Sequence, residues 1–99
     1  QGRLQQAIES LRSNEQELRR LGALHVSIFG SLARNESRTG SDIDVLVEID
    51  QSKQLGIFEY SRLKLYINEL LDGVADVSND STLKPLLRQN IERDQVRAF

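Results

Sequence analysis

The sequence predicts a single domain of the α/β (α+β) class, with helices packed on one small mixed sheet of three strands. Apolar residues recur at helical spacing in three segments, and short strand-like apolar runs separate those segments. The 99-residue length and the 38% share of apolar residues suit one modest core. No linker, repeat or low-complexity segment divides the chain, so we expect residues 1–99 to form one domain.

The first segment is predicted to be a long helix. Its apolar stripe consists of Leu4, Ala7, Ile8, Leu11, Leu18 and Leu21. Glu15 stands where an apolar residue is expected, so the helix should be irregular around Ser13 and Asn14. Gly22 is placed as its C-terminal stop. Alternation over residues 23–28 then predicts the first strand.

The middle of the chain predicts a loop, a strand and a second loop. Residues 31–41 are polar and follow Gly30, which favours a loop. The run 43–49 predicts a second strand. Because its centre, 45–47, is continuously apolar, both faces of this strand should be buried. Residues 51–56 are expected to form the next loop.

The last part predicts a helix, a short strand and a final helix. The first of these helices carries the apolar stripe Tyr60, Leu63, Ile67, Leu70 and Leu71. Gly73 follows its end, and residues 74–77 form the third predicted strand. The final helix carries Leu83, Leu86, Leu87 and Ile91, and Pro85 lies in its first turn, where a missing N–H is tolerated.

Composition excludes several classes of protein. Thirteen Lys and Arg against fifteen Asp and Glu give a net charge of −2, which argues against direct nucleic-acid binding. The absence of Cys excludes disulfides, zinc–thiolate sites and thiol chemistry. No apolar run approaches the roughly 18 residues that span a bilayer, and the polar start does not resemble a signal peptide. We therefore expect a small cytoplasmic domain without a membrane partner.

The first candidate motif is the turn at Gly30 and Ser31, directly after the first strand. Glycine permits a backbone turn that exposes N–H groups, and the serine hydroxyl adds a donor, so the turn could hold phosphate oxygens. Taken alone, an ordinary turn explains the same residues.

The second motif is the pair Asp42 and Asp44 at the start of the second strand. Residues i and i+2 of a strand face the same side, and paired carboxylates suit divalent cations in phosphoryl transfer. A solvated strand edge is the alternative. It is weakened because the strand continues into a buried run, where two like charges repel each other unless a cation neutralises them. From the pair alone, both readings stay open.

The third motif is Asp76 within the short apolar strand 74–77. A neighbouring strand could bring this carboxylate beside Asp42 and Asp44, and a solvent-facing edge position is the alternative. Glu48 shares their face but lies farther along the strand. For His25, the only histidine, we expect a structural role.

Together these motifs resemble the polymerase-beta nucleotidyltransferase superfamily. The shared pattern is Gly30-Ser31, ten residues, then Asp42-Ile43-Asp44-Val45, and later Asp76. The segments 29–34 and 41–47 are similar to those of the minimal nucleotidyltransferases (MNT or MntA-type antitoxins), which are paired with HEPN-domain toxins. The resemblance spans nearly the whole chain. Asn35 departs from the glycine usual in that family, and asparagine tolerates the same backbone.

The resemblance implies a polymerase-beta-like fold and a role for each motif. Asp42 and Asp44 would bind the Mg²⁺ that carries ATP, and Asp76 would complete the site of a second Mg²⁺. Gly30 and Ser31 would hold the β- and γ-phosphates. Arg34 would neutralise developing charge, although a surface salt bridge to Glu36 explains it equally well.

The resemblance also implies a reaction and a partner. The chain would adenylylate a HEPN-domain RNase toxin on tyrosine and so silence it, and the partner protein would supply the acceptor that a small domain cannot enclose. Two alternatives stay open: an antitoxin that blocks its partner by binding alone, and a nucleotidyltransferase acting on a small molecule. Three converging acids favour the enzyme, because a protein that only binds has no need of them.

Overall fold

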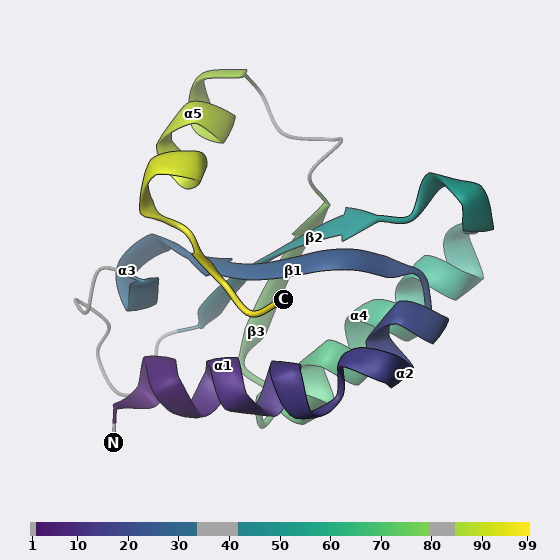
Figure 1. Ribbon diagram of the computed structural model, residues 1–99, viewed down its shortest axis with the longest axis horizontal. Helices are drawn as coiled ribbons and strands as arrows, with labels where there is room; N and C mark the ends of the chain where they lie inside the picture. Colours follow the sequence, from purple (N-terminus) through teal and green to yellow (C-terminus); the bar gives the residue numbers. More distant parts are fainter. Residues whose placement is uncertain (1, 34–41, 80–84) are drawn as a thin grey trace.

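The computed structural model describes residues 2–33, 42–79 and 85–99. Its helices are α1 (Arg3–Ser13), α2 (Glu15–Arg20), α3 (Gly30–Ala33), α4 (Ile57–Leu70) and α5 (Pro85–Asp94), with a short 3₁₀ turn η1 (Gln51–Lys53). Its strands are β1 (Ala23–Phe29), β2 (Ile43–Ile49), β3 (Ala75–Asn79) and β4 (Val96–Arg97). Figure 1 shows these elements arranged around one sheet.

The sheet has the order β3-β2-β1-β4. β1 runs antiparallel to both β2 and β4, and β3 runs parallel to β2. The predicted mixed α/β architecture is therefore confirmed, but the predicted number of three strands is wrong. The strand that the sequence did not reveal is β4, because two residues are too few to show an alternating pattern.

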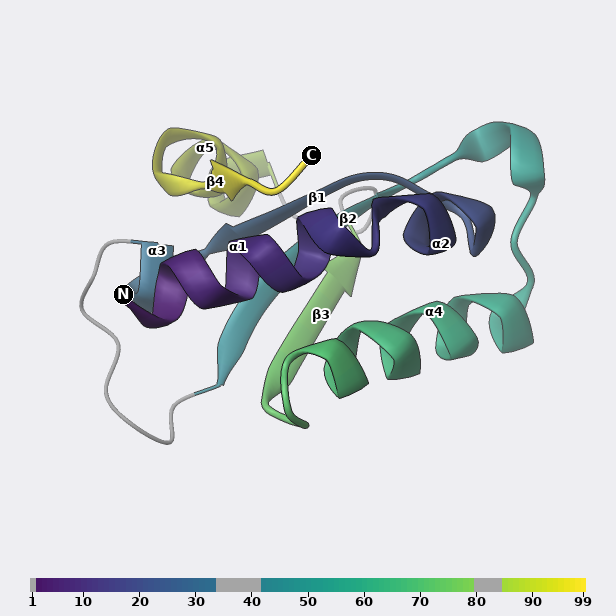
Figure 2. The same ribbon diagram turned by 60° about the horizontal axis from the view of Figure 1, so that its bottom comes forward.

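Helices α1, α2 and α4 cover one face of the sheet, as Figure 2 shows, and the main core lies between them. The fully buried side chains of this core are Leu11, Leu18, Val26, Ile28, Val45, Val47, Leu63 and Ile67. On the strands these positions are every second residue, as the period of two requires. This face supplies most of the hydrophobic stabilisation of the fold.

Helix α5 covers part of the opposite face. Leu46, Ser27 and Ile91 are buried here, apart from the main core. The continuous apolar run 45–47 is thus explained as predicted: Val45 and Val47 face the main core, and Leu46 lies on the side that α5 covers. Among the residues described, α5 is the long helix that lies on this side (Figure 2).

The predicted irregularity of the first helix is confirmed at Asn14, which separates α1 from α2. The Asn14 side chain donates from Nδ2 to the Ser10 carbonyl oxygen at 2.8 Å. Its Oδ1 accepts a hydrogen bond of 3.0 Å from the Tyr66 hydroxyl of α4. This link ties the break between the two helices to the helix packed beside them.

Several local features differ from the prediction. The pairing of β1 with β2 shifts between Ala23 and His25, so Ala23 enters the core and Leu24 stays half-buried. Strand β3 begins one residue later than predicted and ends two residues later. The predicted polar loop begins after α3, and the predicted loop 51–56 contains η1. A bulge and a short turn leave no periodic pattern in the sequence.

The last residues are held against α1 and β1. The Arg12 Nε donates to the Ala98 carbonyl oxygen at 2.7 Å, and the Ala98 N–H donates to the Val26 carbonyl oxygen at 2.8 Å. The Arg19 guanidinium lies 4.9 Å from the centre of the Phe99 ring. These contacts fix β4 and therefore the position of Arg97. In the described ranges, no helix combines the length and apolar character that crossing a bilayer requires.

Candidate active site

The parallel pairing of β2 with β3 places Asp44 and Asp76 side by side. Asp44 is the register partner of Asp76. Paired residues on neighbouring strands lie about 5 Å apart and point to the same face of the sheet. Asp42 lies just before β2, and both Asp42 and Asp76 are exposed. The end of the sheet where β2 and β3 begin therefore carries three carboxylates.

Gly30 lies against the carboxylate of Asp44. It joins β1 to α3 with φ +73°, in the left-handed region that favours glycine. A Cβ at this position would overlap the Asp44 Oδ2. The strand pairing explains the contact, because Phe29, the residue before Gly30, is the register partner of Asp44. Any side chain at position 30 would displace the central carboxylate of the site.

The start of β3 is held by α4. The Asn68 Oδ1 accepts a hydrogen bond of 2.9 Å from the Ala75 N–H, and the Gly73 N–H donates to the Asn68 carbonyl oxygen at 2.7 Å. Asp76 is the next residue along the strand. One asparagine thus holds the turn after α4 and the strand that carries the third carboxylate.

The donor set fits a magnesium ion in type, because carboxylate oxygens are hard ligands. The cation site is not assembled in advance: within residues 2–33, 42–79 and 85–99 no three His, Asp or Glu side chains converge closely enough to hold a metal ion. Like charges favour such separation until a cation neutralises them. Binding of Mg²⁺ would therefore have to draw the three side chains together.

Some of the predicted site residues lie outside what the structure describes. Arg34, and with it Asn35 and Glu36, falls in the gap between α3 and β2. Ser31 belongs to α3, where the sequence predicts a loop, and its side chain is not described. Their roles stay predictions from the sequence.

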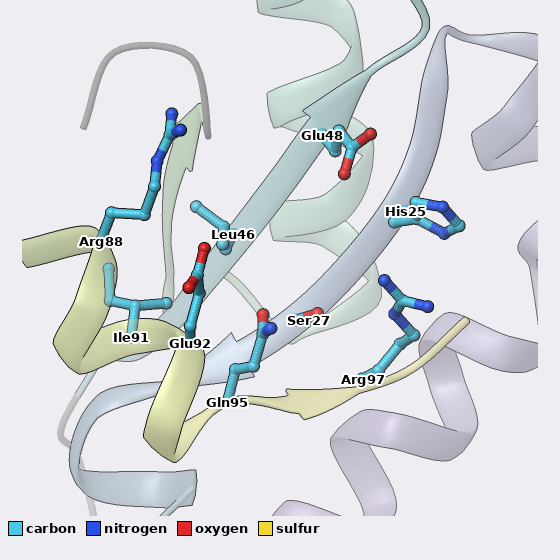
Figure 3. Close-up of a pocket in the computed structure, with 9 residues that line it drawn as sticks. All are labelled: His25, Ser27, Leu46, Glu48, Arg88, Ile91, Glu92, Gln95 and Arg97. Atoms are coloured by element: carbon cyan, nitrogen blue, oxygen red, sulfur yellow. The ribbon is translucent and has the colours of Figure 1, made fainter. Parts of the chain in front are cut away.

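A cavity lies on the same face of the sheet as the carboxylates, and the sequence did not predict it. It is a cavity of about 370 Å³ between α5 and the sheet (Figure 3). His25 and Glu48, which are register partners on β1 and β2, form one side, and Arg97 of β4 lies beside them. The position of His25 on this face could have been noted from its alternation with Val26. The packing of α5 against the sheet, which closes the cavity, could not be predicted from the sequence.

Comparison with known proteins places the chain in a family. A family model for the nucleotidyltransferase domain matches residues 5–97. A protein adenylyltransferase MntA of Thermococcus cleftensis is 33% identical over 91 residues, which cover 90% of this chain and 90% of that protein. A Methanocaldococcus jannaschii protein that is also named as a protein adenylyltransferase is 41% identical over 75 residues, covering 76% of this chain and 78% of its own.

Solved structures support the same assignment. One described as a minimal nucleotidyltransferase superimposes with a TM-score of 0.71 at 33% identity, over 90% of this chain and 93% of that chain. Two toxin–antitoxin complexes share the fold at lower identity. One contains AMP-PNP, with a TM-score of 0.66, 19% identity and coverage of 89% of this chain and 72% of that chain. The other holds a tri-AMPylated Shewanella oneidensis HEPN toxin with its MNT antitoxin, with a TM-score of 0.62, 17% identity and coverage of 93% and 71%.

The Gly30 turn, the Asp44–Asp76 pairing and the mixed sheet thus occur in a chain that matches one domain family over nearly its whole length. This chain is a minimal nucleotidyltransferase and belongs to the nucleotidyltransferase domain family.

Proposed function

We propose that the chain is a metal-dependent protein adenylyltransferase that transfers AMP from ATP to a tyrosine of a HEPN-domain RNase toxin, and thereby acts as its antitoxin. The observation that carries the proposal is the pairing of Asp44 with Asp76 beside Gly30, in a member of the nucleotidyltransferase family. Because ATP is the substrate, the proposed reaction takes place in the cytoplasm.

In the proposed reaction, Asp42 and Asp44 would hold the Mg²⁺ that carries the triphosphate, and together with Asp76 they would hold a second ion. When bound, Mg²⁺ would neutralise the phosphate charge and stabilise the attacking and leaving oxygens. Gly30 contributes by leaving room for the Asp44 carboxylate. The backbone around Gly30 and Ser31 would hold the β- and γ-phosphates.

The transfer is an in-line displacement at the α-phosphorus. The tyrosine oxygen forms a bond to this phosphorus while the bond to the bridging oxygen of the β-phosphate breaks, and pyrophosphate leaves. Asp76, which is exposed to an incoming substrate, would accept the hydroxyl proton as base, or the second ion would activate the hydroxyl and the proton would pass to solvent. Asp44, packed against Gly30, is the fixed carboxylate of the site.

The partner is proposed from the comparisons. A Thermococcus cleftensis relative, with 33% identity over 90% of this chain, is named as a protein adenylyltransferase. A structural neighbour is an MNT antitoxin in complex with an AMPylated HEPN toxin. The exposed end of the sheet leaves Asp42 and Asp76 accessible to an acceptor as large as a protein.

The test is transfer of label from ATP that carries ³²P at its α-phosphate. Wild type, Asp44→Asn and Asp72→Asn are each incubated with Mg²⁺ and the HEPN-domain protein of the same organism, and RNase activity is measured in parallel. Asp72 lies in the turn after α4, so Asp72→Asn is the matched control. We expect wild type and Asp72→Asn to label and silence the partner, and Asp44→Asn to do neither.

The other outcomes identify the alternatives. If Asp44→Asn silences the RNase without labelling it, the chain acts as an antitoxin by binding alone. If wild type labels a small hydroxyl compound such as an aminoglycoside but no protein, the substrate class is wrong. If labelled phosphate appears on serine rather than tyrosine after hydrolysis of the product, only the acceptor residue is wrong.

A further inference from the structure

The cavity between α5 and the sheet lies on the same face of β2 as Asp44 of the candidate active site. On β2, Leu46 follows Asp44 by two residues on the same face, a distance of about 7 Å along the strand. Glu48 follows after the same interval and borders the far end of the cavity. An extended chain spans each of these intervals with two residues, so one peptide segment could reach from the cavity to the carboxylates.

The cavity is lined by charged side chains of both signs. Two arginines and two glutamates line it. In the part of the chain that the structure describes, Glu48, Glu92 and Arg97 take part in no ion pair. Figure 3 shows Glu92 reaching from α5 toward the sheet, and the Arg97 guanidinium pointing toward His25.

His25 adds a second, independent observation. Its Nδ1 is buried and has no hydrogen-bond partner, whereas buried polar atoms in folded proteins are nearly always paired. Leaving one unpaired costs about 1–3 kcal/mol. Because His25 also lines the cavity, its imidazole is placed to hydrogen-bond a polar ligand group that enters there.

The lining favours a polypeptide over a nucleotide. Among the described lining residues, the imidazole of His25 is the one ring that could stack on a base, and the two glutamates offset the two arginines, so the lining has no net positive charge to attract a triphosphate. A peptide segment carries charged side chains of both signs and backbone amides. Leu46 and Ile91 provide an apolar floor for its side chains, and Gln95 provides amide hydrogen bonds.

We propose that this cavity binds a segment of the acceptor protein and holds its hydroxyl-bearing residue over the carboxylates. The segment contributes an acidic side chain that faces Arg97 and His25, and a basic side chain that faces Glu48 and Glu92. This inference rests on the proposed function, because it assigns a recognition site for the acceptor of that reaction. Glu48 and Arg97 are thus residues that determine acceptor specificity, and they touch neither ATP nor Mg²⁺.

Charge reversal tests the proposal without requiring transfer. The dissociation constant for the HEPN-domain protein of the source organism is measured by calorimetry for Glu48→Arg and Arg97→Glu. The matched controls are Glu69→Arg and Arg62→Glu, which make the same changes at exposed positions of α4, across the sheet from the cavity. Affinity for AMP-PNP with Mg²⁺ and the melting temperature are measured for every variant.

We expect both cavity variants to bind the acceptor about tenfold more weakly or worse, while AMP-PNP affinity and melting temperature match those of wild type. The α4 variants should bind the acceptor as wild type does. Unchanged acceptor affinity in the cavity variants overturns the proposal and shows that Glu48 and Arg97 are solvated surface charges. Loss of AMP-PNP affinity with acceptor affinity retained makes the cavity a nucleotide subsite instead. If wild type itself does not bind the HEPN-domain protein, the proposal is overturned together with the proposed partner.

A crosslinking experiment keeps the proposal testable where a charge reversal unfolds the chain. The sequence contains no cysteine, so Gln95→Cys can be labelled at a single position with benzophenone maleimide. On irradiation we expect this protein to crosslink to the HEPN-domain protein, and the equivalent label at Glu69→Cys not to. Equal crosslinking from both positions contradicts the proposal. Crosslinking without any transfer by wild type refutes the adenylyl transfer and leaves the binding site standing.

Discussion

The two faces of the sheet differ in burial and in the polarity of their side chains. On β2, Ile43, Val45 and Val47 point into the core that α1, α2 and α4 close. Asp44 and Glu48 alternate with them and point to the other face, which α5 covers only in part. One strand therefore serves stability with every second residue and presents the carboxylates of Asp44 and Glu48 on its other face.

The comparison explains how a domain of 99 residues can present three carboxylates and remain folded. The paired carboxylates Asp44 and Asp76 and the turn at Gly30 lie away from the main core. The core face of the sheet is packed with fully buried aliphatic side chains. Substitutions on the two faces should therefore have separable consequences, and four predictions test that separation.

The largest expected effect is on catalysis, and it should distinguish Asp44 from its neighbour Val45 on β2. Asp44→Asn should lower kcat/KM for adenylyl transfer about 1000-fold, a loss of about 4 kcal/mol of transition-state stabilisation, with an unchanged melting temperature. Val45→Ala should lower the free energy of unfolding by about 2 kcal/mol and keep its activity. Urea unfolding and initial rates measure the two quantities. More than a tenth of the wild-type rate in Asp44→Asn would break the comparison.

The core face is tested on α4. Leu63 is fully buried and Leu65 is 63% exposed. Leu63→Ala should lower the free energy of unfolding by about 3 kcal/mol, because it removes methyl groups and leaves a cavity. Leu65→Ala should change it by less than about 0.5 kcal/mol. Equal losses of unfolding free energy at both positions would show that the core between the sheet and α4 does not supply most of the stability.

A substitution at Gly30 should change both stability and activity. It strains the backbone at residue 30, and it displaces the carboxylate of Asp44, which lies against Gly30. Gly30→Ala should lower the free energy of unfolding by about 2 kcal/mol, since alanine is strained at φ +73°. It should also displace Asp44 and lower transfer. Gly2→Ala is the control, because a Cβ there meets no atom within 4 Å. Full activity in Gly30→Ala would refute the contact with Asp44.

The smallest effect lies at the end of β2, away from both faces. The Ser52 hydroxyl donates to the Asp50 Oδ1 at 2.7 Å and the Ser52 N–H donates at 3.0 Å, which together lower the pKa of Asp50. A carboxyl group whose pKa is lowered by folding stabilises the folded state at pH values above the pKa of the unfolded chain, which is about 4. The contribution is lost as the pH falls through the folded pKa.

Ser52→Ala removes the stronger of these contacts. The variant should be slightly less stable than wild type at pH 7 and equal to it at a pH where Asp50 is protonated. Urea unfolding at the two pH values measures the difference. A loss that is the same at both pH values would show that the hydroxyl stabilises the turn without acting on the carboxylate.

Much of the fold was predictable because its physics is local. Helical spacing located α4, and the misplaced Glu15 predicted the break that the structure shows at Asn14. The alternation of apolar residues located β1, and the continuous apolar run 45–47 located β2. The bulge at Ala23 and the two-residue β4 were missed, because pairing with distant strands creates both of them and neither has a period of its own.

The candidate site was predictable in part. The motif residues predicted Asp42, Asp44 and Asp76 as the site, and in the structure the last two are register partners on neighbouring strands. Their metal-binding and catalytic roles stay predictions. The cavity could not be foreseen, because His25, Glu92 and Arg97 come from three elements whose packing is set by tertiary contacts such as that of Arg12 with Ala98.

The most direct test of the division between the faces is a ¹H–¹⁵N NMR titration of wild type with AMP-PNP and Mg²⁺. The account predicts that the amide shifts change at Gly30, Asp42, Asp44 and Asp76 on the polar face, and that the amides of α1 and α4 stay in place. Changes centred on α1 and α4, with Asp44 and Asp76 unaffected, would contradict it.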